Sequence, residues 1–118
     1  MFRIARKQAE QSQFKRARVG AVIVKGGRVL SCGFNEIRHH KLLSEKPYPE
    51  STHAEEAAIV RLLQKRRQHD LVGADIYVCR INRAGESRLA RPCSNCERLI
   101  RSVGIRNVYW TTNDRCYV

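Results

Sequence analysis

The sequence predicts one α/β domain over residues 1–118, built as three layers with helices on both faces of a mixed β-sheet. Two observations carry this prediction. In the second half of the chain, short apolar runs alternate with helical patterns, which favours parallel strands joined by crossover helices. Near the start, two apolar runs flank Gly26-Gly27, which predicts an antiparallel hairpin. No repeat, low-complexity stretch or linker divides the chain, so a second domain is not expected.

The expected order of elements is helix, strand, strand, helix, strand, helix, strand. The first helix, over about residues 2–16, is amphipathic because Phe2, Ala5 and Ala9 share one face. The remaining elements are strands over 19–24 and 29–34, a helix over about 53–65, a strand over 75–81, a helix that Pro92 opens and Gly104 closes, and a strand over 105–112.

Two connections bear on function. Residues 35–52 form a long connection, and connections of this length in compact domains are usually functional or mobile. At the C-terminal end, only residues 113–115 separate the last strand from Cys116-Tyr117-Val118. A further parallel strand needs a crossover of about a dozen residues, so the fold is expected to be C-terminally short. A short sheet edge favours a homo-oligomer that covers it.

The charge balance is strongly basic. The chain has 23 Lys and Arg against 11 Asp and Glu, a formal net charge of +12. Such a field attracts phosphate groups, so a nucleotide or a nucleic acid is the expected partner. The alternative is a basic, solvated surface without a specific ligand.

The cysteines and the apolar content indicate the compartment. No apolar run approaches the ~20 residues of a membrane span, and none follows the basic start as in a secretory signal. We therefore expect no membrane partner and a cytoplasmic location. Five cysteines with one close pair, Cys93 and Cys96, do not resemble a disulfide framework. A close pair in an intracellular chain points to metal or redox chemistry.

Two motifs carry the chemistry. Cys93 and Cys96, in Pro-Cys-Ser-Asn-Cys, are three residues apart at a helix start, so both thiols face one side. The positive end of the helix favours the thiolate, the form that binds metal. With the imidazole of His53, they supply three of the four ligands of tetrahedral zinc and leave one position for water. Taken alone, the cysteine pair could also be a redox pair or half of a structural zinc site.

The second motif is Thr52-His53-Ala54-Glu55. Thr52 and Glu55 have the spacing of a helix capping box, which is the alternative to a catalytic role for Glu55. His53 and Glu55 would lie about 200° apart on an ideal helix. They can share a site only if His53 belongs to the half-formed first turn.

His-x-Glu at one helix start and Pro-Cys-x-x-Cys at a second form the signature of zinc nucleobase deaminases. From the 19–24 strand to Tyr109, the sequence resembles the cytidine and deoxycytidylate deaminase superfamily. The superfamily includes tRNA adenosine deaminases and polynucleotide cytosine deaminases. The resemblance implies that His53, Cys93 and Cys96 ligate Zn²⁺. It also implies that Glu55 takes a proton from the zinc-bound water and passes it to the ring nitrogen and the leaving ammonia.

Substrate contacts are expected around this site. Asn35 matches the family position that contacts the sugar; its alternative is a turn-forming Asn that ends a strand. Ala54, between His53 and Glu55, is a second candidate. Basic side chains of the long connection are candidate phosphate contacts if that connection closes over the substrate: Arg38, Lys41 and Lys46.

Three departures from the family pattern bear on which branch of the superfamily the sequence resembles. The first ligand is His53, whereas free-cytidine deaminases resemble one another in having Cys there. Arg91 precedes Pro92 where the tRNA branch typically has Glu, and Gly33-Phe34-Asn35-Glu36 lacks the second glycine usual in the deoxycytidylate branch. The leading hypothesis is hydrolytic deamination of cytosine to uracil in a small (deoxy)cytidine nucleotide such as dCMP. The alternatives are deamination of a base within single-stranded DNA or RNA, and a non-catalytic zinc-stabilised binding module.

Overall fold

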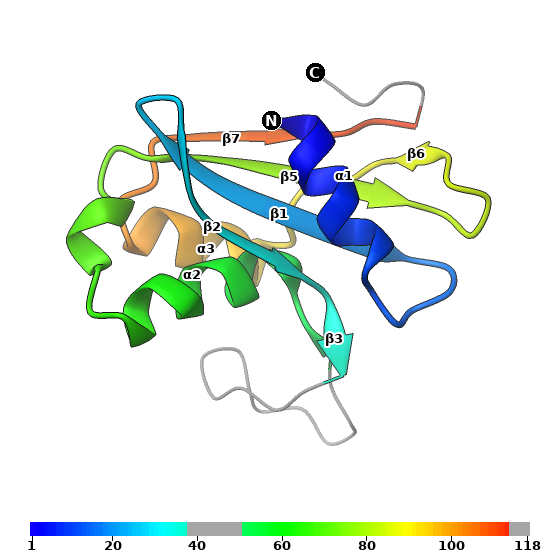
Figure 1. The fold of residues 1–118 in the computed structure, drawn as a ribbon, viewed down its shortest axis with the longest axis horizontal. Helices are drawn as coiled ribbons and strands as arrows, with labels where there is room; N and C mark the ends of the chain where they lie inside the picture. Colours follow the sequence, from blue (N-terminus) through cyan, green and yellow to red (C-terminus); the bar gives the residue numbers. More distant parts are fainter. Residues whose placement is uncertain (38–50, 114–118) are drawn as a thin grey trace.

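The computed structural model describes residues 1–37 and 51–113. At the centre of its main sheet lies β1 (Arg18–Lys25), which pairs antiparallel with β2 (Arg28–Phe34) on one side and with β5 (Asp75–Ile81) on the other. β5 also pairs parallel with β7 (Asn107–Trp110) and antiparallel with the two-residue β6 (Ser87–Arg88). The five-stranded sheet is therefore mixed, as the sequence predicts (Figure 1).

The predicted hairpin is the turn from β1 to β2. Gly26 and Gly27 form its two-residue turn with φ values of +59° and +78°. Both values lie in the left-handed region, which glycine enters without strain and which matches the twist of the flanking strands.

Helices cover both faces of the sheet, which confirms the three layers. α1 (Phe2–Glu10) packs on one face, and α2 (Ala54–Gln64) and α3 (Ser94–Ser102) pack on the other (Figure 1). Alternate residues of β1 divide between the two cores: Ala21 and Ile23 join the core under α2 and α3, and Val22 joins the core under α1.

Two glycines let the helices sit directly on the strands. A Cβ at Gly33 of β2 would lie 2.6 Å from the backbone nitrogen of Ala58 and 2.7 Å from the carbonyl oxygen of Ala54, both in α2. A Cβ at Gly20 of β1 would lie 2.0 Å from the carbonyl oxygen of Ala5 in α1. Any side chain at either position would push a helix away from the sheet.

The first helix is shorter than predicted. It ends at Glu10 rather than near residue 16. Two residues later, the Ser12 hydroxyl accepts a hydrogen bond from the Phe14 amide at 3.3 Å and donates to the Asn35 carbonyl at 2.9 Å. Serine that bonds local backbone in this way competes with helix formation.

Other boundaries move by one or two residues. The expected helix over 53–65 is α2 over 54–64, the third helix begins at Ser94 rather than at Pro92, and the last strand is β7 over 107–110 rather than 105–112. The strand over 75–81 has the predicted bounds. A short 3₁₀-helix, η1 (Gln68–Leu71), follows α2.

The long connection contains structure at both of its ends. The two-residue strands β3 (Glu36–Ile37) and β4 (Ser51–Thr52) pair antiparallel and bring these ends together. The candidate phosphate contacts Arg38, Lys41 and Lys46, and the C-terminal residues 114–118, lie outside the described residues. Among the described helices, none has the length and apolar character needed to cross a bilayer.

Candidate active site

The structure brings His53, Cys93 and Cys96 together across the starts of α2 and α3. The ligand atoms of the three side chains all lie within 4.8 Å of one another. His53 Nδ1 is 3.1 Å from Cys96 Sγ and 3.7 Å from Cys93 Sγ. Tetrahedral zinc, with bonds of about 2.3 Å to sulfur and 2.0 Å to nitrogen, separates these atoms by about 3.5 Å. The donor set and its spacing therefore fit zinc.

Both ligand-bearing motifs place one ligand just before a helix. His53 is the N-cap of α2, with extended backbone angles (φ −70°, ψ 151°), and Cys93 is the N-cap of α3 (φ −68°, ψ 167°). The ideal-helix angle between His53 and Glu55 therefore does not apply, because His53 stands outside the helix. At α3, the Cys96 amide donates to Cys93 Sγ at 3.5 Å, which holds the two thiols on one side.

Cys96 is the most deeply buried of the three candidate ligands. Cys96 is fully buried, whereas Cys93 is exposed and His53 is half-buried. Burial raises the pKa of the Cys96 thiol far above its ordinary value, and the nearby Glu55 and Cys93 raise it further. At Cys96, burial thus outweighs the helix-end effect expected from the sequence. Because metals bind the thiolate, metal binding here would release a proton.

Glu55 is a buried carboxyl group beside the ligands. Its residue is only 5% exposed, and it lines the same pocket as His53 and Cys93. Burial raises the Glu55 pKa to about 7, against a hydrogen bond from its own backbone amide that lowers it; the charge of Glu56 adds to the rise. A pKa near 7 suits a group that takes and returns a proton at neutral pH.

The capping-box alternative for Glu55 does not match the geometry. The N-cap of α2 is His53, so Thr52 lies one residue too early for that role. Moreover, the Thr52 hydroxyl is buried and has no hydrogen-bond partner among the described residues. Glu55 is therefore not paired with Thr52 in a capping box.

The pocket beside the ligands has a volume of about 220 Å³. Two candidate substrate contacts from the sequence, Asn35 and Ala54, line it. Asn35 also extends the β1–β2 ladder with its side chain: Oδ1 accepts from the Val19 amide at 2.9 Å, and Nδ2 donates to the Ala17 carbonyl at 2.8 Å. Among the described residues, these bonds use one amide hydrogen and one lone pair of Asn35, which leaves one of each for a ligand.

Sequence reasoning missed three lining residues: Val19, Ala90 and Arg91. The two apolar ones carry no chemical signal in a sequence. Arg91, two residues before Cys93, stands out in the sequence only as a departure from the tRNA branch and not as a pocket residue. Its guanidinium lies over the Trp110 ring, with 5.8 Å between Cζ and the ring centroid.

Two thiols and an imidazole at helix starts, with a buried carboxyl group beside them in a three-layer α/β domain, define the class of zinc-binding nucleobase deaminases. The family of the "cytidine and deoxycytidylate deaminase zinc-binding region" matches residues 1–112. The chain belongs to this family, and the protein is a deaminase.

The relatives agree with this assignment. The chain is 37% identical, over 114 residues, to a protein of Aliivibrio fischeri described as an uncharacterized deaminase in the luxG 3′ region; the match covers 92% of this chain and 67% of that protein. In structure it is similar to dCMP deaminase of the cyanophage S-TIM5 in apo form, with a TM-score of 0.70, 25% identity, and coverage of 92% and 77% of the two chains.

Two further structures share the fold. The S-TIM5 enzyme in complex with dCMP and dUMP has a TM-score of 0.67 and 24% identity, with coverage of 92% and 76%. Cytidine deaminase from Mycobacterium tuberculosis has a TM-score of 0.56 and 20% identity, with coverage of 98% and 87%. The fold thus serves deaminases of a nucleotide and of a nucleoside.

Proposed function

We propose that the protein hydrolyses the amine of cytosine to a carbonyl in a (deoxy)cytidine nucleotide, such as dCMP, with zinc as cofactor. The observation that carries this proposal is the buried Glu55 carboxyl group in one pocket with His53 and Cys93. A purely structural zinc site needs no buried acid beside its ligands. The S-TIM5 enzyme, whose structure with dCMP and dUMP shares this fold, supports a mononucleotide substrate.

His53, Cys93 and Cys96 would hold the zinc, which when bound acidifies a water molecule and makes it a nucleophile near neutral pH. Glu55 accepts a proton from the attacking water and delivers it to the ring nitrogen, and it then takes the remaining proton of the added hydroxyl and passes it to the departing amine. Water adds at the carbon that bears the amine, the carbon–nitrogen bond breaks, and ammonia leaves. Asn35 and the backbone of Ala54 orient the base and sugar from the pocket wall.

The test uses purified protein with its zinc content measured. We expect about one zinc per chain and turnover of dCMP or CMP to the uracil product. The panel also contains deoxycytidine, adenosine and single-stranded oligonucleotides. The proposal fails if zinc-loaded protein deaminates no cytosine compound, or if a disulfide joins Cys93 and Cys96.

A second candidate function is deamination of a base within single-stranded nucleic acid, and one surface favours it. Two adjoining hollows of about 460 and 550 Å³ share Arg83 at the end of the sheet where β1 begins. Four basic residues line the two hollows, and we call this combined surface the basic hollow: Lys15, Arg16, Arg18 and Arg83. The half-buried ring of Phe14 lines the same surface and offers a face for base stacking.

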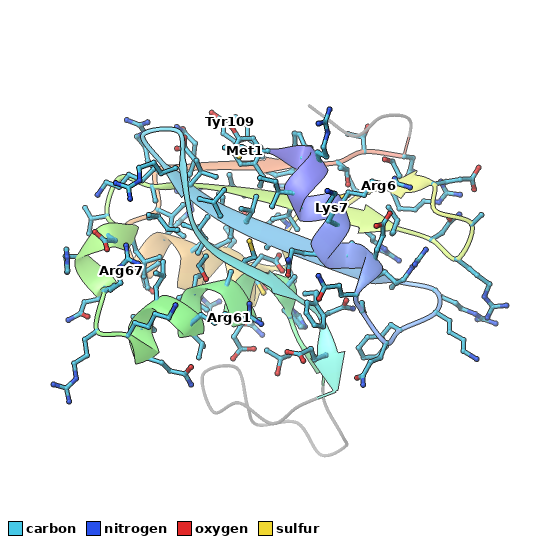
Figure 2. The ribbon with its side chains drawn as sticks, viewed as in Figure 1. Met1, Arg6, Lys7, Arg61, Arg67 and Tyr109 are labelled. Atoms are coloured by element: carbon cyan, nitrogen blue, oxygen red, sulfur yellow. The ribbon has the colours of Figure 1, made fainter. Side chains whose placement is uncertain are left out.

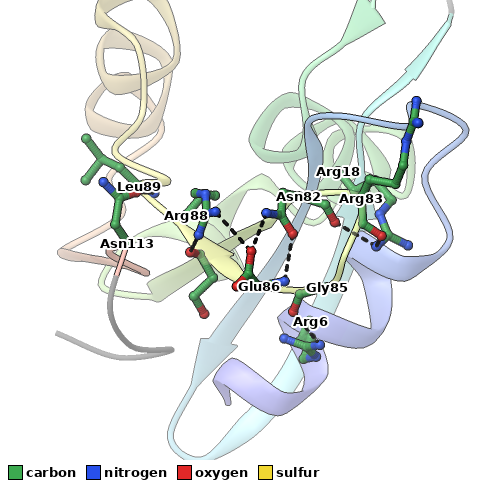
Figure 3. Close-up of polar contacts among 10 residues, drawn as sticks. Arg6, Arg18, Asn82, Arg83, Gly85, Glu86, Arg88, Leu89 and Asn113 are labelled. Atoms are coloured by element: carbon green, nitrogen blue, oxygen red, sulfur yellow. Dashed lines mark hydrogen bonds and ion pairs between the residues drawn. The ribbon is translucent and has the colours of Figure 1, made fainter.

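The cations of the basic hollow lack acidic partners. Among the described residues, none of the four forms an ion pair, and no acidic residue lines either hollow. Among the described residues, Arg18 donates to the Asn82 and Arg83 carbonyls (Figure 3), and its buried Nε has no hydrogen-bond partner. The nearby Glu86 is already bound by Asn82 and Arg88.

Some basic side chains elsewhere also bond to carbonyl or carboxylate groups. In Figure 2, Arg6, Arg61 and Arg67 come from different parts of the surface, and each has a partner: the Gly85 carbonyl, the Cys32 carbonyl and Asp70. The basic hollow thus places four cations that have no ion pair among the described residues beside a concave surface. This arrangement suits the phosphates of a strand.

Binding of a labelled single-stranded oligonucleotide at several salt concentrations tests this second candidate. A strand that uses the basic hollow binds tightly at low salt and loses affinity steeply as salt rises, because each neutralised phosphate releases counterions. Tight binding together with no turnover of any mononucleotide would make this candidate the leading one.

A further inference from the structure

Arg91 is a cation at the rim of the pocket that the proposed chemistry does not use. It lines the pocket with Asn35 and Cys93, and its side chain is exposed. Among residues 1–37 and 51–113 it forms no ion pair. A pocket-lining cation that no described carboxylate neutralises is available to an anionic ligand.

The surroundings of Arg91 hold it in place. The preceding residue is tied to the end of β7, because the Ala90 amide donates to the Thr111 carbonyl at 3.0 Å. Pro92 follows and restricts the backbone on the other side. The guanidinium then lies 5.8 Å from the centre of the Trp110 ring, within the range of a cation–π interaction. An arginine ordered in advance in this way loses less entropy when it binds a ligand.

The position of Arg91 relative to the candidate metal ligands indicates which part of a bound substrate it would contact. Asn35 follows β2, whereas Arg91 lies in the segment between β6 and α3, so different parts of the chain bring the two residues to the pocket. A base whose amine points at the His53 and Cys93 side has its ring inside the pocket and its sugar and phosphate toward the rim. The base carries no charge, so the phosphate is the anionic part of such a substrate.

We propose that Arg91 binds the phosphate of the substrate and thereby sets a preference for nucleotides over nucleosides; this rests on the proposed cytosine nucleotide deaminase function. The planar guanidinium can give two parallel N–H donors to two phosphate oxygens. Trp110 positions that guanidinium and does not itself contact the phosphate.

The test compares ligands that differ only in the phosphate. Arg91→Ala should lower kcat/KM for dCMP roughly tenfold to a hundredfold, the usual effect of losing a hydrogen bond between charged groups. The loss for deoxycytidine should be at least about fivefold smaller. Arg91→Lys, which keeps the charge without the two-pronged geometry, should fall between wild type and Arg91→Ala. The matched control is Arg98→Ala, which removes an exposed arginine of α3 that does not line the pocket.

Trp110 gives an independent readout because it is the chain's single tryptophan. Binding of the product dUMP should change its fluorescence in wild type, deoxyuridine should change it less, and Arg91→Ala should remove the difference. Equal losses for dCMP and deoxycytidine in Arg91→Ala, with no dUMP-specific fluorescence change, would overturn the assignment of Arg91. By contrast, wild-type protein that turns over no cytosine compound contradicts the proposed function, whereas the dUMP titration still reports on Arg91.

Discussion

The pocket beside His53 and the basic hollow meet at the start of β1, yet their charged groups differ in burial and in charge. Arg18 turns toward the hollow, and its neighbour Val19 lines the pocket. In the pocket, the Glu55 carboxyl group is buried, and burial raises its pKa; beside the pocket, burial also raises the pKa of the Cys96 thiol. In the hollow, three exposed cations and the half-buried Arg18 surround a surface that no described acidic residue lines.

We therefore expect the pocket groups to determine reactivity and the cations of the basic hollow to determine the attraction of an anionic partner. Burial gives the pocket groups a defined geometry and a shifted proton affinity, so each substitution there should change reactivity. The exposed cations have neither property and act through a field that salt screens. The two regions should therefore respond to different perturbations, and each of the following variants should affect mainly one of them.

The largest expected effect is at Glu55. Glu55→Gln keeps the size of the side chain but removes the proton-transfer function, so the deaminase rate should fall by at least about 10²–10⁴-fold. Zinc content and oligonucleotide affinity should stay at wild-type values, as measured by metal analysis and fluorescence anisotropy. A variant that still deaminates normally would refute the catalytic role.

The reverse experiment alters the basic hollow alone. In a Lys15→Glu, Arg83→Glu double variant, oligonucleotide affinity should fall by more than about tenfold. The slope of log K against log salt should also become shallower by about 1.4, at 0.7 for each lost phosphate contact on a single strand. The control, Lys65→Glu with Arg98→Glu, makes the same charge change on exposed residues outside both hollows. Equal losses in the two double variants would mean that net charge, rather than the hollow, binds the strand.

A third pair of variants moves one helix at a time. Gly33→Ala places a methyl group 2.6 Å from the α2 backbone, and Gly20→Ala places one 2.0 Å from the α1 backbone. Each should lower the free energy of unfolding by about 1–3 kcal/mol or more, measured by urea denaturation. Because α2 carries Glu55, only Gly33→Ala should also lower activity per folded molecule. Similar activity losses in both variants would show that the pocket depends on the whole sheet rather than on α2.

The smallest expected effect is the salt dependence of mononucleotide turnover. One phosphate group releases few counterions, so KM for dCMP should change by less than about tenfold between 50 and 200 mM salt. A protein with 6–10 phosphate contacts would lose 10³–10⁵ in affinity over the same range. A steep dependence with dCMP would mean that the basic hollow contributes to substrate binding at the pocket.

The elements that local pattern determines could be predicted from the sequence. The strand over 75–81 has the expected bounds because its residues alternate between the two cores and a glycine turn precedes it. The first helix was predicted six residues too long, because helical periodicity does not reveal that Ser12 bonds to Asn35, 23 residues away. That contact exists only in the folded chain.

In the candidate site, too, some features could be predicted from the sequence and others could not. The ligand types and Glu55 follow from motifs, because the chemistry of metal ligation restricts the residues that can serve. Whether His53 stands inside or before α2 depends on backbone angles that the motif leaves open. The place of Arg91 depends on a contact with Trp110, from a strand 19 residues further along the chain. Long side chains have many rotamers, so such contacts require the tertiary structure.

The two helix starts that supply the ligands also link metal uptake to folding. Cys93 and Cys96 are neighbours in the chain, but His53 is 40 residues from Cys93. An unfolded chain would have to close that loop at an entropic cost before all three side chains could hold one ion. Zinc would therefore bind the folded chain far better than the unfolded one and shift the folding equilibrium, by about 2.7 kcal/mol at a free concentration one hundred times its dissociation constant. A zinc-starved cell would then hold this protein as a less stable chain, more open to proteolysis.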